Sequence, residues 1–140
     1  MRSLIACVFV LAIAGCADRG DVVTPGTPAS SIQTSLSPGE TIRPFPEPFS
    51  ITFNSVTADS RCPLGALCIW AGDGATWFTL RSGSGAADAC TLHTALQPQF
   101  VVSNGFRVEL VGLAPFRRID STIAPASYVA TINVSRVHIN

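Results

Sequence analysis

Residues 99–110 read QFVVSNGFRVEL, and this stretch contains the strongest fold signal in the chain. After the pair Asn104-Gly105, the apolar residues Phe106, Val108 and Leu110 occupy alternate positions. Asn-Gly is the preferred pair for a two-residue β-hairpin turn, because both turn positions require positive φ angles. Residues 99–110 therefore predict two antiparallel strands joined by a tight turn.

The same period of two recurs in other parts of the chain, whereas no window shows a helical period. The clearest further segments are Phe49–Asn54, Trp77–Leu80 and Tyr128–Ser135. Weaker strand candidates are Thr41–Arg43, Cys68–Ala71 and Cys90–Ala95. A long segment, Ala114–Pro125, has the character of a Greek-key crossing loop. Seven or eight short strands with Gly- and Pro-rich turns predict an all-β chain, folded as a single antiparallel β-sandwich or barrel-like domain.

The composition excludes several classes of protein. The 140 residues include nine basic residues, all arginine, and nine acidic residues, so the formal net charge is zero. A neutral chain lacks the basic stripe that nucleic-acid binding requires. No apolar run reaches the roughly 18 residues of a transmembrane helix. The length suits one domain of ordinary size.

The N-terminus has the features of a secretory signal peptide. Arg2 precedes an apolar run from Leu4 to Ala14, and small residues follow. This order predicts a signal peptide over residues 1–15. The four residues Ile13-Ala14-Gly15-Cys16 resemble the bacterial lipobox. An ordinary signal peptide is the alternative.

The lipobox resemblance implies that Cys16 receives a diacylglyceryl group and, after cleavage before it, a further acyl chain such as palmitate. The protein would then be anchored in the bacterial cell envelope. Ala17 is not acidic, which favours the outer membrane and leaves the inner membrane open. The following residues show no periodicity, so we expect a lipidated N-terminus and disordered tether over residues 16–37. The folded domain is expected over residues 38–140.

Residues 59–72, DSRCPLGALCIWAG, are the most distinctive stretch of the chain. Thiols of exported proteins pair when their spacing lets them meet, so we expect a disulfide between Cys62 and Cys68. A seven-residue ring restricts the unfolded chain by about 2.4 kcal/mol in the loop-entropy model. Cys90 is then left over and is expected to be a buried free thiol.

The strings Asp59–Pro63 and Cys68–Gly72 resemble a motif of small exported bacterial proteins of unknown function. Those proteins share a short β-rich domain and often a lipobox. The resemblance implies a fold and a cellular location, but it implies no activity.

Two interpretations of this loop remain open. As a scaffold, Trp70 would pack over the disulfide, and Arg61 would form a surface ion pair with Asp59 or Asp73. As a recognition loop, the stiffened ring would present Asp59, Arg61 and Trp70 to a ligand with little loss of entropy. A wider apolar patch is a further candidate surface, composed of Trp70, Trp77, Phe45 and Phe116.

No pattern for catalysis or a cofactor is found, so we expect no catalytic residues, no bound metal and no enzyme activity. We therefore expect a non-catalytic envelope lipoprotein that acts as a binding or structural module. Its partners would be the membrane, through the lipid, and an envelope protein or extracellular ligand; the chain is expected to be monomeric. The alternative is a metal-handling protein for zinc or copper. Its soft ligands would come from Cys62, Cys68, Cys90, His93 and His138, although the cysteine spacing differs from structural zinc sites.

Overall fold

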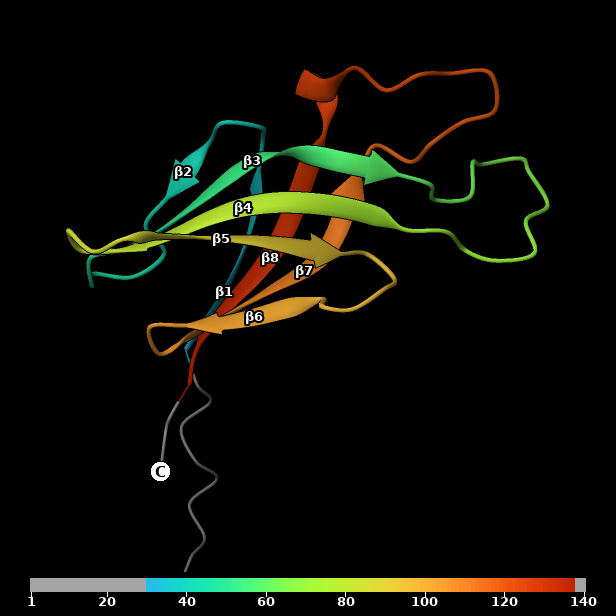
Figure 1. The fold of residues 1–140 in the computed structure, drawn as a ribbon. Coiled ribbons are helices and arrows are strands. Elements are labelled where there is room, and N and C mark those ends of the chain that lie inside the picture. The colour runs from blue at the N-terminus through green and yellow to red at the C-terminus, as the bar shows by residue number, and fades with distance from the viewer. Residues whose placement is uncertain (1–29, 138–140) are drawn as a thin grey trace, which may run out of the picture.

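The computed structural model describes residues 30–137, which form two four-stranded antiparallel sheets (Figure 1). The strands are β1 (Ser31–Leu36), β2 (Thr41–Ile42), β3 (Phe49–Asp59), β4 (Gly74–Ser82), β5 (Ala87–His93), β6 (Phe100–Ser103), β7 (Phe106–Ala114) and β8 (Val129–Arg136). A short 3₁₀ helix, η1 (Pro125–Ser127), precedes β8. The expected signal peptide, Cys16 and His138 lie outside the described residues.

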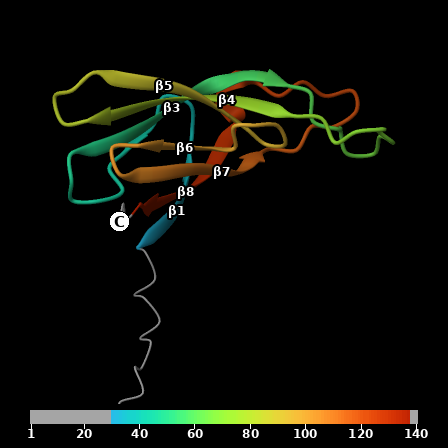
Figure 2. The same cartoon turned by 60° about the horizontal axis from the view of Figure 1, so that its bottom comes forward.

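The sheet topology is simple. One sheet has the order β1-β8-β7-β6 and the other has the order β2-β3-β4-β5. Figure 2 shows the two sheets as separate layers. The chain changes sheet only after β1 and after β5. The all-β prediction is confirmed, and because the sheets do not close into a barrel, the sandwich is the architecture that forms.

The core lies between the sheets and follows from the alternation in the sequence. Phe49 and Phe53 of β3 are fully buried, as are Val108 of β7 and Ile132 of β8. The Phe49 ring stacks on Phe106 with centroids 4.4 Å apart, which joins the two sheets. Burying each such side chain contributes about 1.5–3 kcal/mol.

The Asn104-Gly105 hairpin is confirmed. Asn104 has a φ of 52° and Gly105 a φ of 79°, so both turn residues are left-handed. The register pairs Ser103 with Phe106 and continues to Phe100 and Glu109.

The predicted tether extends too far toward the C-terminus. Residues Ser31–Leu36 form β1, which pairs with β8 from Ser31↔Ser135 to Leu36↔Ala130. Leu36 is fully buried, while the preceding residues of β1 are mostly exposed. The strand is held by its backbone ladder and one anchoring side chain, which explains why it has no strong hydrophobic pattern.

Two other predictions are also wrong. Residues Cys68–Ala71 are not a strand, because the disulfide loop turns them away from both sheets. The segment Ala114–Pro125 does not cross between sheets, because it joins β7 to β8, which are neighbours in one sheet.

Candidate functional site

Three long connections meet at one end of the sandwich (Figures 1 and 2). They join β3 to β4, β5 to β6, and β7 to β8, and cover residues 60–73, 94–99 and 115–128. Because β1 is antiparallel to β8, it begins at the opposite end of the molecule. The chain therefore enters the domain far from these loops.

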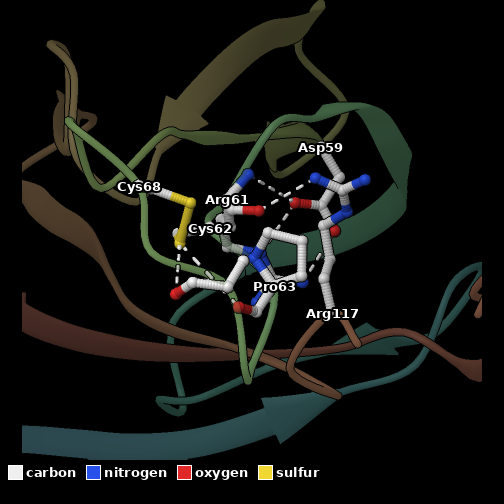
Figure 3. Close-up of a disulfide and its surroundings, with 7 residues drawn as sticks. Asp59, Arg61, Cys62, Pro63, Cys68 and Arg117 are labelled. Atoms are coloured by element: carbon white, nitrogen blue, oxygen red, sulfur yellow. Dashed lines mark hydrogen bonds and ion pairs between the residues drawn. A yellow bond between two sulfur atoms is a disulfide. The ribbon is translucent and has the colours of Figure 1, made fainter. Parts of the chain in front are cut away.

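The expected disulfide between Cys62 and Cys68 is formed, with the two Cα atoms 6.0 Å apart. Figure 3 shows it beside Arg61 and Asp59. Below the ring, two backbone bonds close the loop: Cys62 N–H donates to the Ala71 carbonyl (2.8 Å) and Ser60 N–H donates to the Asp73 carbonyl (2.7 Å). The loop is thus a disulfide ring on a hydrogen-bonded base.

Gly72 is the last residue of the string Cys68–Gly72, and the structure shows why a glycine is needed there. Its φ is +70°, and a Cβ built there would lie 1.9 Å from the Ser60 carbonyl oxygen. Only glycine permits this close approach of the two limbs of the loop base.

Arg61 fastens the loop to the end of β7. Its guanidinium donates to both carboxylate oxygens of Asp59, at 2.8 and 2.7 Å, which makes a bidentate pair. It also donates to the carbonyl oxygens of Leu113 and Pro115. The pairing with Asp59 is as expected, but it is not a surface contact, because the two side chains are only 12% and 7% exposed.

Asp59 also receives a hydrogen bond from the Tyr128 hydroxyl, at 3.0 Å. Burial opposes ionisation of Asp59, but the bonds and charge of Arg61, with the Tyr128 hydroxyl, outweigh it and lower the pKa of the carboxyl. Burial and the Asp59 carboxylate raise the pKa of Tyr128, which keeps the hydroxyl protonated as a donor. Asp59 lies in β3 and Tyr128 immediately precedes β8, so this cluster ties the two sheets together.

The disulfide loop is also bound to the 115–128 connection. Leu64 N–H donates to the Arg117 carbonyl (2.8 Å), and Arg117 Nη1 donates to the Arg61 carbonyl (2.9 Å; Figure 3). These reciprocal bonds join two loops that are far apart in the sequence.

Asp73 and His93 form a second polar cluster. His93 Nδ1 lies 2.6 Å from one Asp73 oxygen, and the other oxygen accepts the N–H groups of Ala95 (2.9 Å) and Leu96 (3.2 Å). Burial opposes ionisation of Asp73, but these bonds outweigh it and lower its pKa. His93, one of the candidate metal ligands, is therefore part of this cluster: its side chain is 21% exposed and contacts Asp73.

Trp70 does not pack over the disulfide as the scaffold interpretation expects, because it is 79% exposed. Leu67 and Ile69 project fully into solvent, with 105% and 106% exposure. Leu64, Leu96 and Ile119 are exposed on the same three loops. We call these six residues the apolar tip: Leu64, Leu67, Ile69, Trp70, Leu96 and Ile119.

Two observations place residues of the apolar tip from different loops near one another. Trp70 and Leu96 line a shared cavity of about 240 Å³. Leu64 forms an isolated β-bridge with Arg118, next to Ile119. Another cavity, of about 320 Å³, has Asp59, Arg117 and Tyr128 among its lining residues. The polar atoms of Asp59 that border it are already hydrogen-bonded within the protein.

The remaining candidate residues are dispersed. Phe45 is buried against Phe106, and Trp77 projects from β4, 42% exposed, so the wider patch is not one surface. Phe116 is exposed on the 115–128 connection. Cys90 is a partly buried free thiol that packs against the core, and burial, with the charge of Asp88, raises its pKa to about 11.

Within residues 30–137, no three His, Cys, Asp or Glu side chains are grouped so as to hold a metal ion. Over the same range, no helix has the length and apolar character needed to cross a membrane.

No family model, curated protein or solved structure matches this chain.

Sequence reasoning missed Tyr128, Arg117 and the Asp73–His93 contact as parts of this end of the molecule. Each joins segments at least 20 residues apart in the chain. No local pattern in the sequence signals these contacts, because each depends on how distant segments pack together.

Proposed function

We propose that this protein is a non-catalytic, lipid-anchored protein of the bacterial cell envelope and that the apolar tip is its binding surface. The observation that carries the binding role is the combination of full exposure at Leu67 and Ile69 with a rigid base. Contiguous exposed apolar residues mark interaction sites in soluble domains. A base closed by a disulfide and by Arg61 keeps the tip ordered before it binds, which reduces the entropy lost on binding.

The polar groups near the tip support a structural role rather than catalysis. Asp59 and Asp73 each accept three or more hydrogen bonds from within the protein. These hydrogen bonds lower the pKa of both carboxyl groups and hold the loop base together, which supports a structural role for them.

The binding role is tested by site-specific photocross-linking in cells. A photoreactive phenylalanine analogue replaces Leu67 in one variant and Val102 in a control. Val102 is also exposed but lies in β6, beside the hairpin at the opposite end. We expect an adduct, of lipid or protein, at position 67 and none at 102; equal labelling at both positions, or none, would remove the binding role.

Anchoring is tested separately with Cys16→Ser. The lipobox resemblance predicts that the wild-type chain sediments with membranes and that the variant is released into the soluble fraction. Each acyl methylene buried in the bilayer contributes about 0.8 kcal/mol, so loss of the lipid should abolish stable attachment. A variant that sediments as completely as the wild type contradicts lipid anchoring.

A further inference from the structure

The shape of the apolar tip restricts what it can bind. Leu67 and Ile69 are as exposed as in an extended chain, so they form a projection and not a groove. A protein partner would need a cavity complementary to this projection. A lipid surface needs no such complementarity, because acyl chains rearrange around an inserted side chain.

The composition of the apolar tip also favours a lipid surface over a protein partner. Residues 62–72 include no charged side chain, and Trp70 is the one among them with an N–H donor on its side chain. The residues that dominate protein–protein binding are enriched in Trp, Tyr and Arg, whereas Leu is under-represented. Surfaces that enter the membrane interface combine Leu with aromatic residues, and Trp prefers the boundary between headgroups and acyl chains.

The hydrogen bonds of the loop backbone limit how deeply the tip can insert. The N–H groups of Cys62, Leu64 and Ala66 donate to carbonyl oxygens within the protein, whereas those of Leu67, Ile69 and Trp70 have no such partner among the described residues. Backbone groups without a partner are costly to bury in hydrocarbon, so these three residues suit the hydrated interfacial region and not the bilayer core. The disulfide holds the projection in one shape while it inserts.

The charges around the tip add little attraction for anionic headgroups. At the loop base, Arg61 is paired with Asp59, and His93 contacts Asp73. On the adjoining connection, Arg117 and Arg118 are offset in part by Asp120. Apolar contact, and not electrostatic attraction, is therefore the main contribution expected.

From these observations we infer that the apolar tip inserts into the interfacial region of a lipid bilayer, with Leu67, Ile69 and Trp70 at the level where headgroups meet acyl chains. This inference rests on the proposed binding role of the tip and specifies its partner as a lipid surface. Because β1 begins at the opposite end of the sandwich, the tip would be a second membrane contact, separate from an anchor at Cys16.

Trp70 is a built-in probe for this contact. The chain has two tryptophans, so Cys16→Ser combined with Trp77→Phe leaves Trp70 as the only one and removes the lipid. This protein is mixed with phosphatidylcholine vesicles, with and without bromine on the acyl chains. We expect Trp70 emission to shift to shorter wavelength and to be quenched by the brominated lipid.

Two matched comparisons make the test specific. Cys16→Ser with Trp70→Phe leaves only Trp77, on the outer face of β4, and its emission should not be quenched. Ile69→Asp should weaken vesicle binding about tenfold or more, whereas Val102→Asp, the same kind of change on β6, should leave it unchanged. Ile69 makes no buried contact, so the unfolding midpoint of Ile69→Asp should match that of its parent, which separates lost binding from lost folding.

Several results would overturn the inference. Absence of vesicle binding, or equal quenching of Trp70 and Trp77, would do so directly. Binding that requires phosphatidylglycerol and disappears at high salt would show that arginine side chains such as Arg117 and Arg118, and not the apolar tip, make the membrane contact. Tip-dependent dimers in sedimentation without vesicle binding would make the partner a second copy. A protein adduct at position 67 in cells, without vesicle binding, would replace the lipid with a protein partner and leave the proposed function standing.

Discussion

Arg61 connects more segments than any other side chain considered in the site. Its guanidinium bonds Asp59 at the end of β3, the carbonyl group of Leu113 in β7 and that of Pro115 just after β7. A planar group with five donors can make these bonds together, and a lysine ammonium cannot. The position therefore depends on the geometry of arginine and not on charge alone.

Arg61→Lys is expected to lower the free energy of unfolding by about 2 kcal/mol, because charged hydrogen bonds to Asp59 and two carbonyl groups are lost in a mostly buried site. Arg81→Lys is the control, since Arg81 is exposed on β4 and its side chain forms no ion pair among the described residues. That change should cost less than about 0.5 kcal/mol. Urea unfolding measures both, and equal losses would show that Arg61 has no special role.

Asp59 and Asp73 make stability depend on pH. Their pKa values are lowered from the ordinary 3.8 in the folded protein, so folding favours the ionised carboxylates. Their contribution is fully present above the unfolded pKa and is lost as pH falls through the folded pKa. We expect the free energy of unfolding to be constant near pH 6 and to decrease below about pH 4.

Asp73→Asn should reduce this acid sensitivity, because the variant has one fewer carboxylate to protonate. Asp120→Asn is the matched control, because it removes one carboxylate from an exposed position on the 115–128 connection. Urea titrations between pH 7 and pH 3 provide the comparison. If the slopes of wild type and Asp73→Asn coincide, the Asp73 cluster does not contribute to acid unfolding.

The disulfide loop is held in its shape in two ways, by the Cys62–Cys68 disulfide and by the backbone hydrogen bonds at its base. The double variant Cys62→Ser/Cys68→Ser is expected to lose about 2.4 kcal/mol of stability from the unfolded-state entropy. Reductant should lower the thermal midpoint of the wild type to that of the variant and should not affect the variant itself. An unchanged midpoint in the double variant would remove the bracing role of the disulfide.

Gly72 tests the base of the loop independently. Gly72→Ala introduces a Cβ into the Ser60 carbonyl, whereas Gly39→Ala has the same left-handed backbone (φ +85°) and no atom within 4 Å. The left-handed backbone alone costs about 1–2 kcal/mol, so Gly39→Ala should lose about that amount. Gly72→Ala should lose about 3 kcal/mol or more. Equal losses would mean that the loop base relaxes to accommodate the methyl group.

On the scale of the whole molecule, β1 sets where the folded domain begins. A chain that starts at Pro38 lacks Leu36, which is fully buried, and leaves the β8 ladder without its neighbour. It should be less stable by about 3 kcal/mol or more, or aggregate through the exposed edge of β8. A chain that starts at Ser30 should match one that starts at Ala17 in its denaturant midpoint. Equal midpoints for all three would restore the boundary expected near residue 38.

Much of the fold could be predicted because its signals are local. The Asn104-Gly105 turn and the alternation in β3, β7 and β8 depend on the geometry of a single strand or turn. β1 and the course of residues 114–125 could not be predicted in this way, because neighbouring strands decide them. β1 is ordered by pairing with β8, almost 100 residues away, and not by a pattern of its own.

The candidate site shows the same difference between features set by local sequence and features set by long-range packing. The sequence by itself determined the all-β class, the Cys62–Cys68 pair and an uncharged loop, since composition and short spacing suffice for each. Only the tertiary structure decided that Arg61 is buried against Asp59, that Tyr128 and Arg117 join it, and that Trp70 faces solvent. Burial and long-range hydrogen bonds arise when segments distant in the chain pack together, and no local pattern encodes that packing.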